Sequence, residues 1–230
     1  MKKALLVLFI FSISISCDKD CPTGPIAAVC SGPITIGSQT WMCKNLDVVV
    51  YRNGDTIPEV KYFKGWSNLK TGAWCYYNND PARGAIYGKL YNWYAVNDPR
   101  GLAPEGWHVP SDSEWKELEL FLGMTQSAVD SIGPRGTNQG GKLKENSSSF
   151  WYCPNTGATN ESGFTALPGG YRSGSGEFDG GAGGSSSWWS STVDISYYAW
   201  ERILSHDFGG IYRYGNDMTY FHSVRCIKDN

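Results

Sequence analysis

Short hydrophobic runs broken by turn residues dominate the chain and predict a mixed domain with more strand than helix. Ile34 to Met42 contains two β-branched or aromatic runs around Gly37-Ser38, a pattern typical of a tight hairpin. Residues 45–51 form a valine-rich run closed by turn formers at 52–55, and we expect a third strand there. The domain is therefore predicted to begin with β-structure.

One well-marked helix is predicted after Pro110. Ser111 and Glu114 form a capping box, in which the serine oxygen accepts a backbone N–H and the glutamate reaches back to the cap. The apolar positions that follow at helical spacing are Trp115, Leu118 and Leu122, with Phe121 beside them. Gly123 is a typical stop. We expect this helix to bury one face.

Shorter helices are predicted over 88–96 and 126–132 from their apolar stripes. After residue 133 the chain is rich in Gly, Ser, Asn and aromatic residues, with frequent turn signals, so many short strands are expected. The predicted strands are 164–167, 188–192, 197–204, 210–214 and 223–228. Residues 174–187 form a glycine-serine loop, and a loop of this length in a compact domain is often functional.

The first sixteen residues have the architecture of a secretory leader. Met1-Lys2-Lys3 is basic, Ala4 to Ile15 is largely apolar, and a small residue precedes Cys17. The apolar run is too short to span a bilayer of roughly 30 Å. We expect Cys17 to be acylated, although Ser14 stands where lipoprotein signals usually have an aliphatic residue. The alternative is simple cleavage, with Cys17 left to join a disulfide.

The expected organisation is a signal peptide over 1–16, a tether over 17–32 and one domain over 33–230. The chain has 20 basic and 22 acidic residues, and loss of the leader makes it slightly more acidic. This charge argues against a nucleic-acid partner. No later segment reaches 18 consecutive apolar residues, so the lipid anchor is the membrane contact we expect.

Six further cysteines suggest disulfides, because their number is even and the chain is exported. They are Cys21, Cys30, Cys43, Cys75, Cys153 and Cys226. A local bridge between Cys21 and Cys30 is favoured, and the other pairings stay open. No two of these six have the spacing of a structural zinc site, and the three histidines are scattered, so zinc is not expected.

Six ordered segments resemble the Fibrobacter succinogenes major paralogous domain. They are Gly37–Leu46, Tyr87–Val96, Pro104–Trp115, Ser162–Arg172, Trp188–Thr192 and Ser223–Asp229. The resemblance covers nearly the whole mature chain and implies an exported protein or lipoprotein of the Bacteroidota or Fibrobacterota, in a family whose biochemical role is largely unassigned. Asp18 and Asp20 beside Cys17 are similar to the export signals of Bacteroidota surface lipoproteins. We therefore expect the cell envelope, at the outer membrane.

The resemblance also implies a distant kinship with the C-type-lectin-like fold shared by formylglycine-generating enzymes. The expected fold class is α+β, with two main helices, short twisted antiparallel strands and long Gly/Ser-rich loops. The helix start at Val109–Trp115 and the closing run Val224–Cys226 carry this second likeness. A shared fold does not by itself define a function.

Aromatic residues are abundant, with 10 tryptophans and 14 tyrosines, and we expect some of them to line a surface. Trp188 and Trp189 are candidates for stacking against sugar rings. Neighbouring strand residues point to opposite faces, so at most one of the two is expected outside the core. The other candidate ligand-binding residues are Tyr171, Arg172, Tyr197, Tyr198, Trp200 and Tyr212.

Metal and catalytic sites have less support. Glu177 and Asp179 are candidates for part of a structural calcium site, with ordinary turn chemistry as the alternative, and no other cofactor is expected. The kinship with formylglycine-generating enzymes implies paired reactive cysteines near the C-terminus, where only Cys226 is found. We expect a protein that is not an enzyme.

These features favour an envelope-anchored binding lipoprotein that recognises a glycan or a protein partner through its loop-rich half. One alternative is a structural or accessory subunit of a cell-surface assembly. A divergent oxidase of the formylglycine-generating type is the third reading.

Overall fold

The computed structural model describes residues 32–61, 69–147 and 149–229. The predicted signal peptide and all but the last residue of the predicted tether lie outside the described residues. The strands are β1 (Ile34–Ile36), β2 (Gln39–Trp41), β3 (Trp74–Cys75), β4 (Leu90–Asn92), β5 (Trp107–His108), β6 (Gly133–Arg135), β7 (Tyr171–Arg172), β8 (Phe178–Asp179), β9 (Ser185–Val193), β10 (Tyr198–Ser205), β11 (Ile211–Asp217), β12 (Phe221–His222) and β13 (Ile227–Lys228). The helices are α1 (Pro81–Tyr87), α2 (Trp93–Val96), α3 (Asp112–Phe121), α4 (Gln126–Asp130), α5 (Gln139–Leu143) and α6 (Gly181–Gly184), with a 3-10 turn at Tyr77–Asn79.

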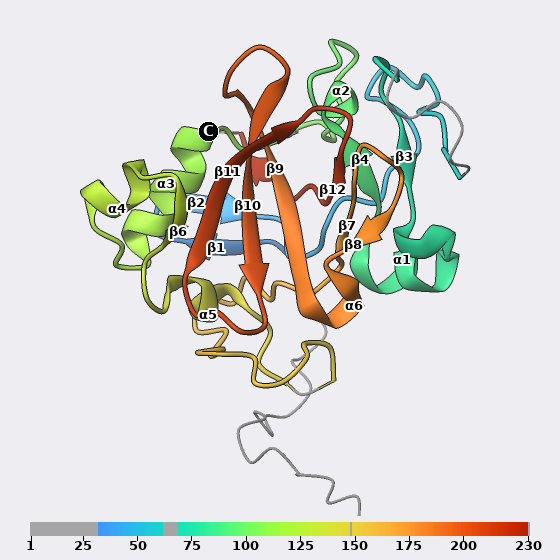
Figure 1. Cartoon of the computed structure of the whole chain (residues 1–230). Coiled ribbons are helices and arrows are strands. Elements are labelled where there is room, and N and C mark those ends of the chain that lie inside the picture. The colour runs from blue at the N-terminus through green and yellow to red at the C-terminus, as the bar shows by residue number, and fades with distance from the viewer. Residues whose placement is uncertain (1–31, 62–68, 148, 230) are drawn as a thin grey trace, which may run out of the picture.

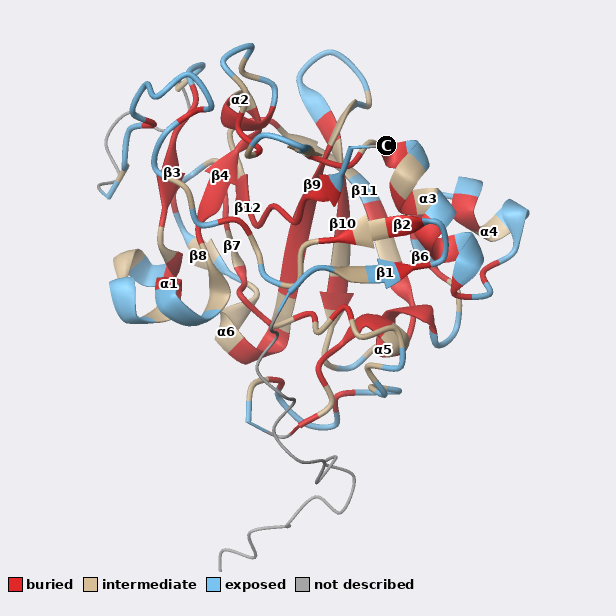
Figure 2. Cartoon of the chain, turned by 180° about the vertical axis from the view of Figure 1, so that it is seen from behind, coloured by how far each residue is buried: buried red, intermediate tan, exposed pale blue. Residues whose placement is uncertain are grey.

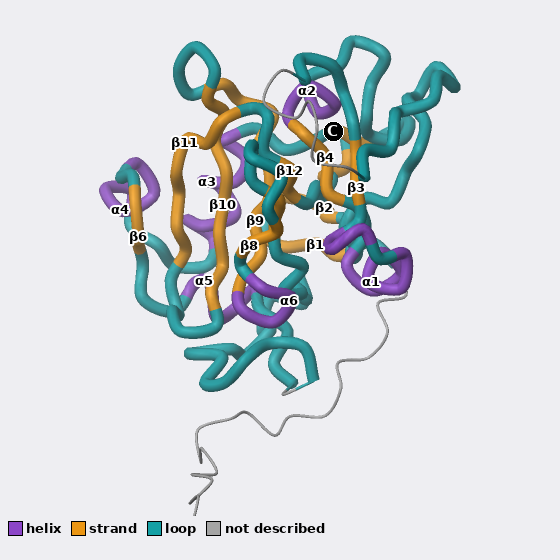
Figure 3. Tube along the Cα trace, turned by 45° about the vertical axis from the view of Figure 1, so that its right-hand side comes forward, coloured by secondary structure: helices purple, strands orange, loops and turns teal. Residues whose placement is uncertain are grey.

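The fold is mixed α/β and mostly β. Its antiparallel sheets have the strand orders β1-β2-β13-β5, β6-β11-β10-β9 and β3-β4-β12-β7-β8. The long strands β9, β10 and β11 cross the middle of the molecule, with α3 and α4 at one side and α1 at the other (Figure 1). The helices lie around these strands (Figure 3). Strand β13 pairs with β2, so the last strand returns to the hairpin that opens the domain.

Trp188 and Trp189 bury strand β9 on both faces. Neighbouring strand residues point in opposite directions, and the two indoles enter different hydrophobic clusters, Trp188 with Trp115 and Trp189 with Trp93. Figure 2 shows β9 buried along most of its length. The predicted alternation is therefore present, but both indoles are in the core, at 1% and 0% exposure.

Helix α3 begins with the predicted capping box. The Glu114 N–H donates to Ser111 Oγ at 3.2 Å, and the Ser111 N–H donates to Glu114 Oε2 at 2.7 Å. Trp115 and Leu118 on its inner face are buried. Gly123, at a φ of 97°, follows the helix end, as the sequence predicts.

Buried ion pairs join α3 to the central sheet. Glu119 accepts hydrogen bonds from Arg135 and Arg202, each at 2.6 Å. Asp112 accepts from Arg213 at 2.8 Å and lies 2.9 Å from Arg202. Charges buried this deeply are stable only when they are paired, so this cluster holds α3 in one position.

Most other predicted elements are confirmed. The hairpin at β1 and β2 and the helix α4 lie where the sequence places them, and the strands predicted over 188–192, 197–204 and 210–214 are parts of β9, β10 and β11. Within 223–228 only β13 is a strand. No helix among the described residues is long and apolar enough to cross a membrane.

Two predicted strands are wrong. Residues 45–51 and 164–167 contain only isolated bridges and join no regular sheet. Leu46 and Phe164 are nevertheless buried, at 3% and 1% exposure. Irregular backbone that packs into a core thus produces the same apolar run as a strand.

The single helix predicted over 88–96 is wrong in its first half. Leu90–Asn92 is strand β4, which pairs with β3 and β12. The side chain of Asn92 then accepts the Ala95 N–H at 3.1 Å and caps the short helix α2. Helix α1, which the sequence pattern did not predict, lies just before this segment. Its N-cap is Asp80, whose side chain accepts the Ala82 N–H at 2.9 Å.

The glycine-serine segment 174–187 is not an open loop. It contains β8, α6 and the start of β9, and its glycines lie against aromatic rings. A Cβ at Gly174 would meet the Tyr220 ring at 3.3 Å, and one at Gly180 would meet the Tyr171 ring at 3.3 Å. Glycine therefore serves close packing here rather than exposure of a flexible loop.

Two of the six cysteines predicted to form disulfides are not disulfide-bonded. Cys75 and Cys226 are free and buried, and burial raises the pKa of each thiol to about 12. Cys43 and Cys153 are disulfide-bonded. The predicted bridge between Cys21 and Cys30 lies outside the described residues.

Candidate functional site

The predicted ligand-binding residues fall in three environments. Those buried in the core are Trp188, Trp189 and Arg172. Those exposed on the hairpin between β9 and β10 are Tyr197 and Tyr198. Those half-buried on the central strands or beside them are Tyr171, Trp200 and Tyr212.

Two of these residues have structural contacts that occupy them. Arg172 donates to the carbonyl of Gly176 at 2.8 Å and to that of Val60 at 3.1 Å, which joins the β7–β8 hairpin to the body of the domain. The ring of Trp200 stacks on the Arg213 guanidinium, 3.3 Å from the ring centre. Neither side chain presents a free planar face.

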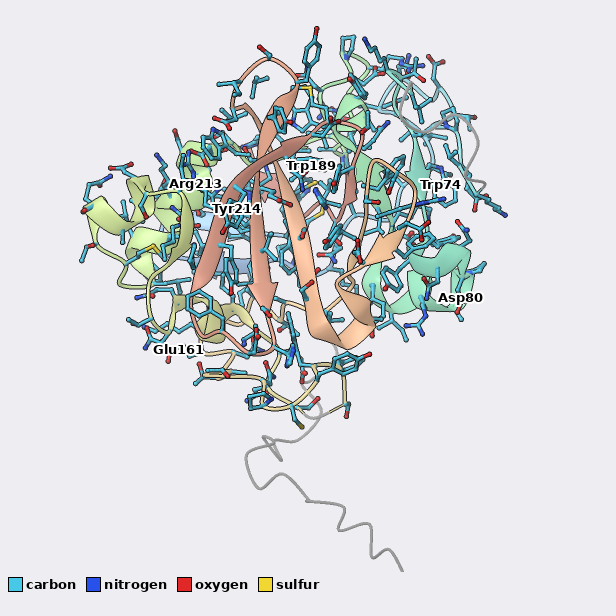
Figure 4. The ribbon with its side chains drawn as sticks, in the orientation of Figure 1. Trp74, Asp80, Glu161, Trp189, Arg213 and Tyr214 are labelled. Atoms are coloured by element: carbon cyan, nitrogen blue, oxygen red, sulfur yellow. The ribbon has the colours of Figure 1, made fainter. Side chains whose placement is uncertain are left out.

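Strand β11 carries two tyrosines on its outer face. Tyr212 and Tyr214 are two residues apart, so both point to the same side, and their rings are nearly parallel, with an angle of 19° and centres 6.2 Å apart. Tyr214 is 39% exposed. Figure 4 labels Tyr214 on β11, in front of the sheet. Together they place two near-parallel aromatic rings next to each other on one strand.

A second tyrosine pair comes from β7 and from the turn before β12, in the neighbouring sheet. The rings of Tyr171 and Tyr220 are 6.3 Å apart at 21°, and both contact the His222 ring, at 5.7 and 6.0 Å. We call the two pairs, Tyr171 with Tyr220 and Tyr212 with Tyr214, the tyrosine face.

Glu201 and His222 lie next to both tyrosine pairs. Glu201 on β10 is in register with Tyr214 on β11, so their side chains share one side of the sheet. Glu201 Oε2 is 3.0 Å from His222 Nε2, and the His222 ring packs on Trp189 with centres 4.1 Å apart. Asn216 donates to the other carboxyl oxygen of Glu201 at 3.0 Å.

Burial makes both members of this pair neutral. It raises the pKa of Glu201 to about 8 and lowers the pKa of His222 to about 3, because each charged form loses its hydration. At neutral pH the glutamic acid therefore carries a proton and donates hydrogen bonds, while the imidazole is uncharged.

The same two residues have unused hydrogen-bonding capacity. Glu201 Oε2 and His222 Nε2 face only each other, 3.0 Å apart, and His222 Nδ1 has no hydrogen-bond partner among the described residues. Buried polar atoms in proteins are nearly always hydrogen-bonded. His222 Nδ1 is thus a buried polar atom that the described residues leave without a partner.

The sequence predicted two of the six residues of this site. Tyr171 and Tyr212 were predicted, and the alternation around Tyr212 would also have indicated Tyr214. Glu201 and His222 carry no local signal, because they are distant along the chain and only the placing of β12 beside β9 and β10 brings them together.

The predicted calcium residues gain no further ligands. Glu177 and Asp179 lie at the β7–β8 hairpin, where Asp179 is in register with Tyr171. Across the described part of the chain, no cluster of three or more His, Cys, Asp or Glu side chains could hold a metal ion. Glu177 and Asp179 are therefore the only candidate calcium ligands at this hairpin among the described residues.

The family model of the Fibrobacter succinogenes major domain matches residues 34–228. The chain belongs to this family. The matched range starts at the first residue of β1 and ends at the last residue of β13, two strands that flank β2 in one sheet. The range that the family model matches is thus one domain, whose first and last strands lie in the same sheet. No curated protein and no solved structure matches the chain.

Proposed function

We propose that this member of the Fibrobacter succinogenes major domain family is a non-catalytic lipoprotein of the cell envelope that binds glycans on the tyrosine face. The observation that carries the proposal is the pair Tyr212 and Tyr214, whose near-parallel rings lie on the outer side of a rigid strand. Sugar rings present apolar C–H faces to aromatic rings. Two tyrosines held by a strand also lose little conformational entropy on binding.

The Glu201–His222 pair supports the polar half of such recognition. A protonated carboxyl donates a hydrogen bond, a neutral imidazole both donates and accepts, and a sugar hydroxyl complements either group. A ligand that reaches the pair gives a partner to His222 Nδ1, which lacks one among the described residues. This gain favours polyhydroxylated ligands over apolar ones.

The envelope location rests on the leader and on Cys17, where two or more acyl chains would give durable attachment. Labelling of the wild type, but not of Cys17→Ala, by a radioactive fatty acid in growing cells supports the anchor.

The C-type-lectin-like architecture is likewise part of the proposal, supported by the capped start of α3 and the closing run 224–226.

Glycan binding is tested with the acylated protein in detergent, on a glycan array and then by calorimetry with the best ligand. Tyr214→Ala is expected to weaken binding at least tenfold, because it removes the more exposed of the two near-parallel rings on β11. Tyr152→Ala is the matched control, since Tyr152 is 55% exposed outside the tyrosine face. An array without any ligand, or equal losses in both variants, would contradict the proposal.

A second candidate function, an accessory subunit of a surface assembly, is favoured by the hairpin between β9 and β10. The hairpin extends past the end of the sheet (Figure 1) and is largely exposed (Figure 2). Its exposed hydrophobic residues are Val193, Ile195, Tyr197 and Tyr198. Contiguous apolar surface of this kind often marks a protein contact. A photo-crosslinker at Ile195 on intact cells would capture a stoichiometric neighbour if this function holds.

A further inference from the structure

The four cysteines among the described residues are of two kinds. Cys75 and Cys226 are buried and free. Cys43 is half-buried, Cys153 is exposed, and both are disulfide-bonded. The bonded cysteines are thus the two that a segment outside the core can reach. Their partners are either each other or the cysteines of the predicted tether.

Cys43 and Cys153 belong to different parts of the domain. Cys43 follows β2 and lines a hollow of about 430 Å³ together with Trp107 of β5, the outer strand of the same sheet. Cys153 lies at the end of β10 in the central sheet, where its carbonyl accepts the His206 Nδ1–H at 3.0 Å. This separation favours partners in the tether over a bond between the two.

The tether enters the domain next to Cys43. Ile34 pairs with Trp41 across the first hairpin, and counting on in the same register places Gly32 opposite Cys43. Gly32 and Cys43 also line the same hollow. Opposite residues of an antiparallel pair are about 4.5 to 5.5 Å apart, and Cys30 stands two residues before Gly32, a reach of at most about 7 Å. Cys30 is therefore close enough to Cys43 for a disulfide.

Cys21 is the cysteine that remains for Cys153. This step rests on the proposed function, in which the sulfur of Cys17 carries acyl chains. Nine residues separate Cys21 from Cys30 and reach about 30 Å when extended, which is about the length of the nine-residue strand β9. The tether is thus long enough to pass from Cys43 to the exposed Cys153.

We propose that two disulfides, Cys30–Cys43 and Cys21–Cys153, fasten the tether to the domain. Each bridge forms when two thiols pass two electrons and two protons to the disulfide of an envelope thiol oxidoreductase, which is reduced to a dithiol. This pairing replaces the local bridge between Cys21 and Cys30 that their spacing favours.

The second bridge also orients the domain on the membrane. Cys153 lies at the α6 end of the central strands, where the Tyr152 N–H donates to the Gly183 carbonyl at 2.7 Å. The β9–β10 hairpin lies at the opposite end of the same strands (Figure 1). Four residues from Cys17 to Cys21 span at most about 14 Å. The α6 end therefore lies next to the bilayer and the hairpin points away from it.

The pairing is tested on the acylated wild-type protein by mass spectrometry of linked peptides. Free thiols are first blocked with iodoacetamide, and thermolysin then cleaves before the aliphatic residues that separate Cys21, Cys30 and Cys43. Peptides linked through Cys30–Cys43 and through Cys21–Cys153 are expected. Any other pairing with Cys17 acylated overturns this proposal alone, whereas Cys17 found in a disulfide contradicts the lipid anchor as well.

Single variants test each bridge separately. Cys21→Ser is expected to make Cys153 reactive with iodoacetamide while Cys43 stays bonded, and Cys30→Ser is expected to do the reverse. Cys75→Ser, at a buried free thiol, is the control and is expected to leave both bonds intact. The pairing is wrong if Cys21→Ser exposes the thiol of Cys43 instead.

The orientation is tested in lipid vesicles that carry the acylated protein. A photo-crosslinker at the exposed Tyr152 is expected to label lipid several-fold more than one at the exposed Ile195 on the hairpin. Equal labelling from the two positions would show that the tether does not hold the α6 end at the membrane.

Discussion

Glu201 shows how a single residue in this protein is defined by its neighbours. It is in register with the buried Trp189 on β9 and with Tyr214 on β11, and it is only 2% exposed. His222 lies against it, Tyr171 and Tyr220 pack on His222, and the loss of hydration on burial raises the pKa of Glu201. Its protonation at neutral pH is therefore a property of the site and not of the residue type.

The pair Glu201 and His222 gives folding stability a defined pH dependence. The raised pKa of Glu201 means that its contribution is complete below pH 4.5 and is lost as pH rises toward 8. The lowered pKa of His222 means that its contribution is complete above pH 6.5 and is lost as pH falls toward 3. The two effects offset each other between pH 4.5 and 6.5, and above pH 6.5 only the Glu201 effect continues.

Glu201→Gln should remove the alkaline part of this dependence. The amide keeps the shape and the bond from Asn216 but does not ionise, so the variant should gain about 2 kcal/mol relative to wild type between pH 6.5 and 8. Urea unfolding at several pH values measures the difference. Glu105→Gln, at an exposed glutamate, is the control. A constant difference across this range would show that Glu201 is ionised in the folded protein.

At the scale of elements, helix α3 is held by charge as well as by its apolar face. Trp115 and Leu118 pack inward, and the neighbouring Glu119 is fully buried between Arg135 and Arg202. An unpaired charge in such a place costs several kcal/mol, so the helix and the central sheet depend on each other.

Glu119→Gln should therefore destabilise the protein strongly. The substitution leaves two buried guanidinium groups without their shared carboxylate, and we expect a loss of about 3 to 5 kcal/mol in the free energy of unfolding. Guanidinium chloride unfolding measures it, with Glu117→Gln on the exposed side of the same helix as control. Equal stability of both variants would mean that the cluster is not essential to the packing of α3.

At the scale of the whole molecule, distant segments close one folded unit. Strand β13 pairs with β2, and an isolated bridge between Trp188 and Ser223 joins the central sheet to the segment after β12. The neighbouring indoles of Trp188 and Trp189 belong to separate hydrophobic clusters on the two faces of β9. We therefore expect the domain to unfold as one unit.

The two free thiols report on this cooperativity. Cys75 and Cys226 lie in different hydrophobic clusters, and burial raises the pKa of both thiols to about 12, so neither should react with iodoacetamide in the native protein. In urea, both should become reactive over the same concentration range, as followed by mass spectrometry. Labelling of one thiol well before the other would reveal two independently unfolding parts.

The sequence by itself determined the features whose signals are local. The capping box at Ser111, the hairpin around Gly37 and the alternation of Trp188 and Trp189 depend on neighbouring residues, and the ordered segments identified the family. The same local reasoning failed for 45–51 and for 88–96, because an apolar run records burial without specifying which backbone conformation is buried.

Only the tertiary structure decided which aromatic residues reach the surface and what lies beneath them. Trp189 and Tyr214 are both aromatic strand residues, but one is enclosed between β9 and β12 whereas the other faces solvent. Glu201 meets His222, and Lys70 meets Tyr197, through contacts between segments far apart in the chain. Burial and ionisation depend on such long-range contacts, which no local pattern of residues specifies.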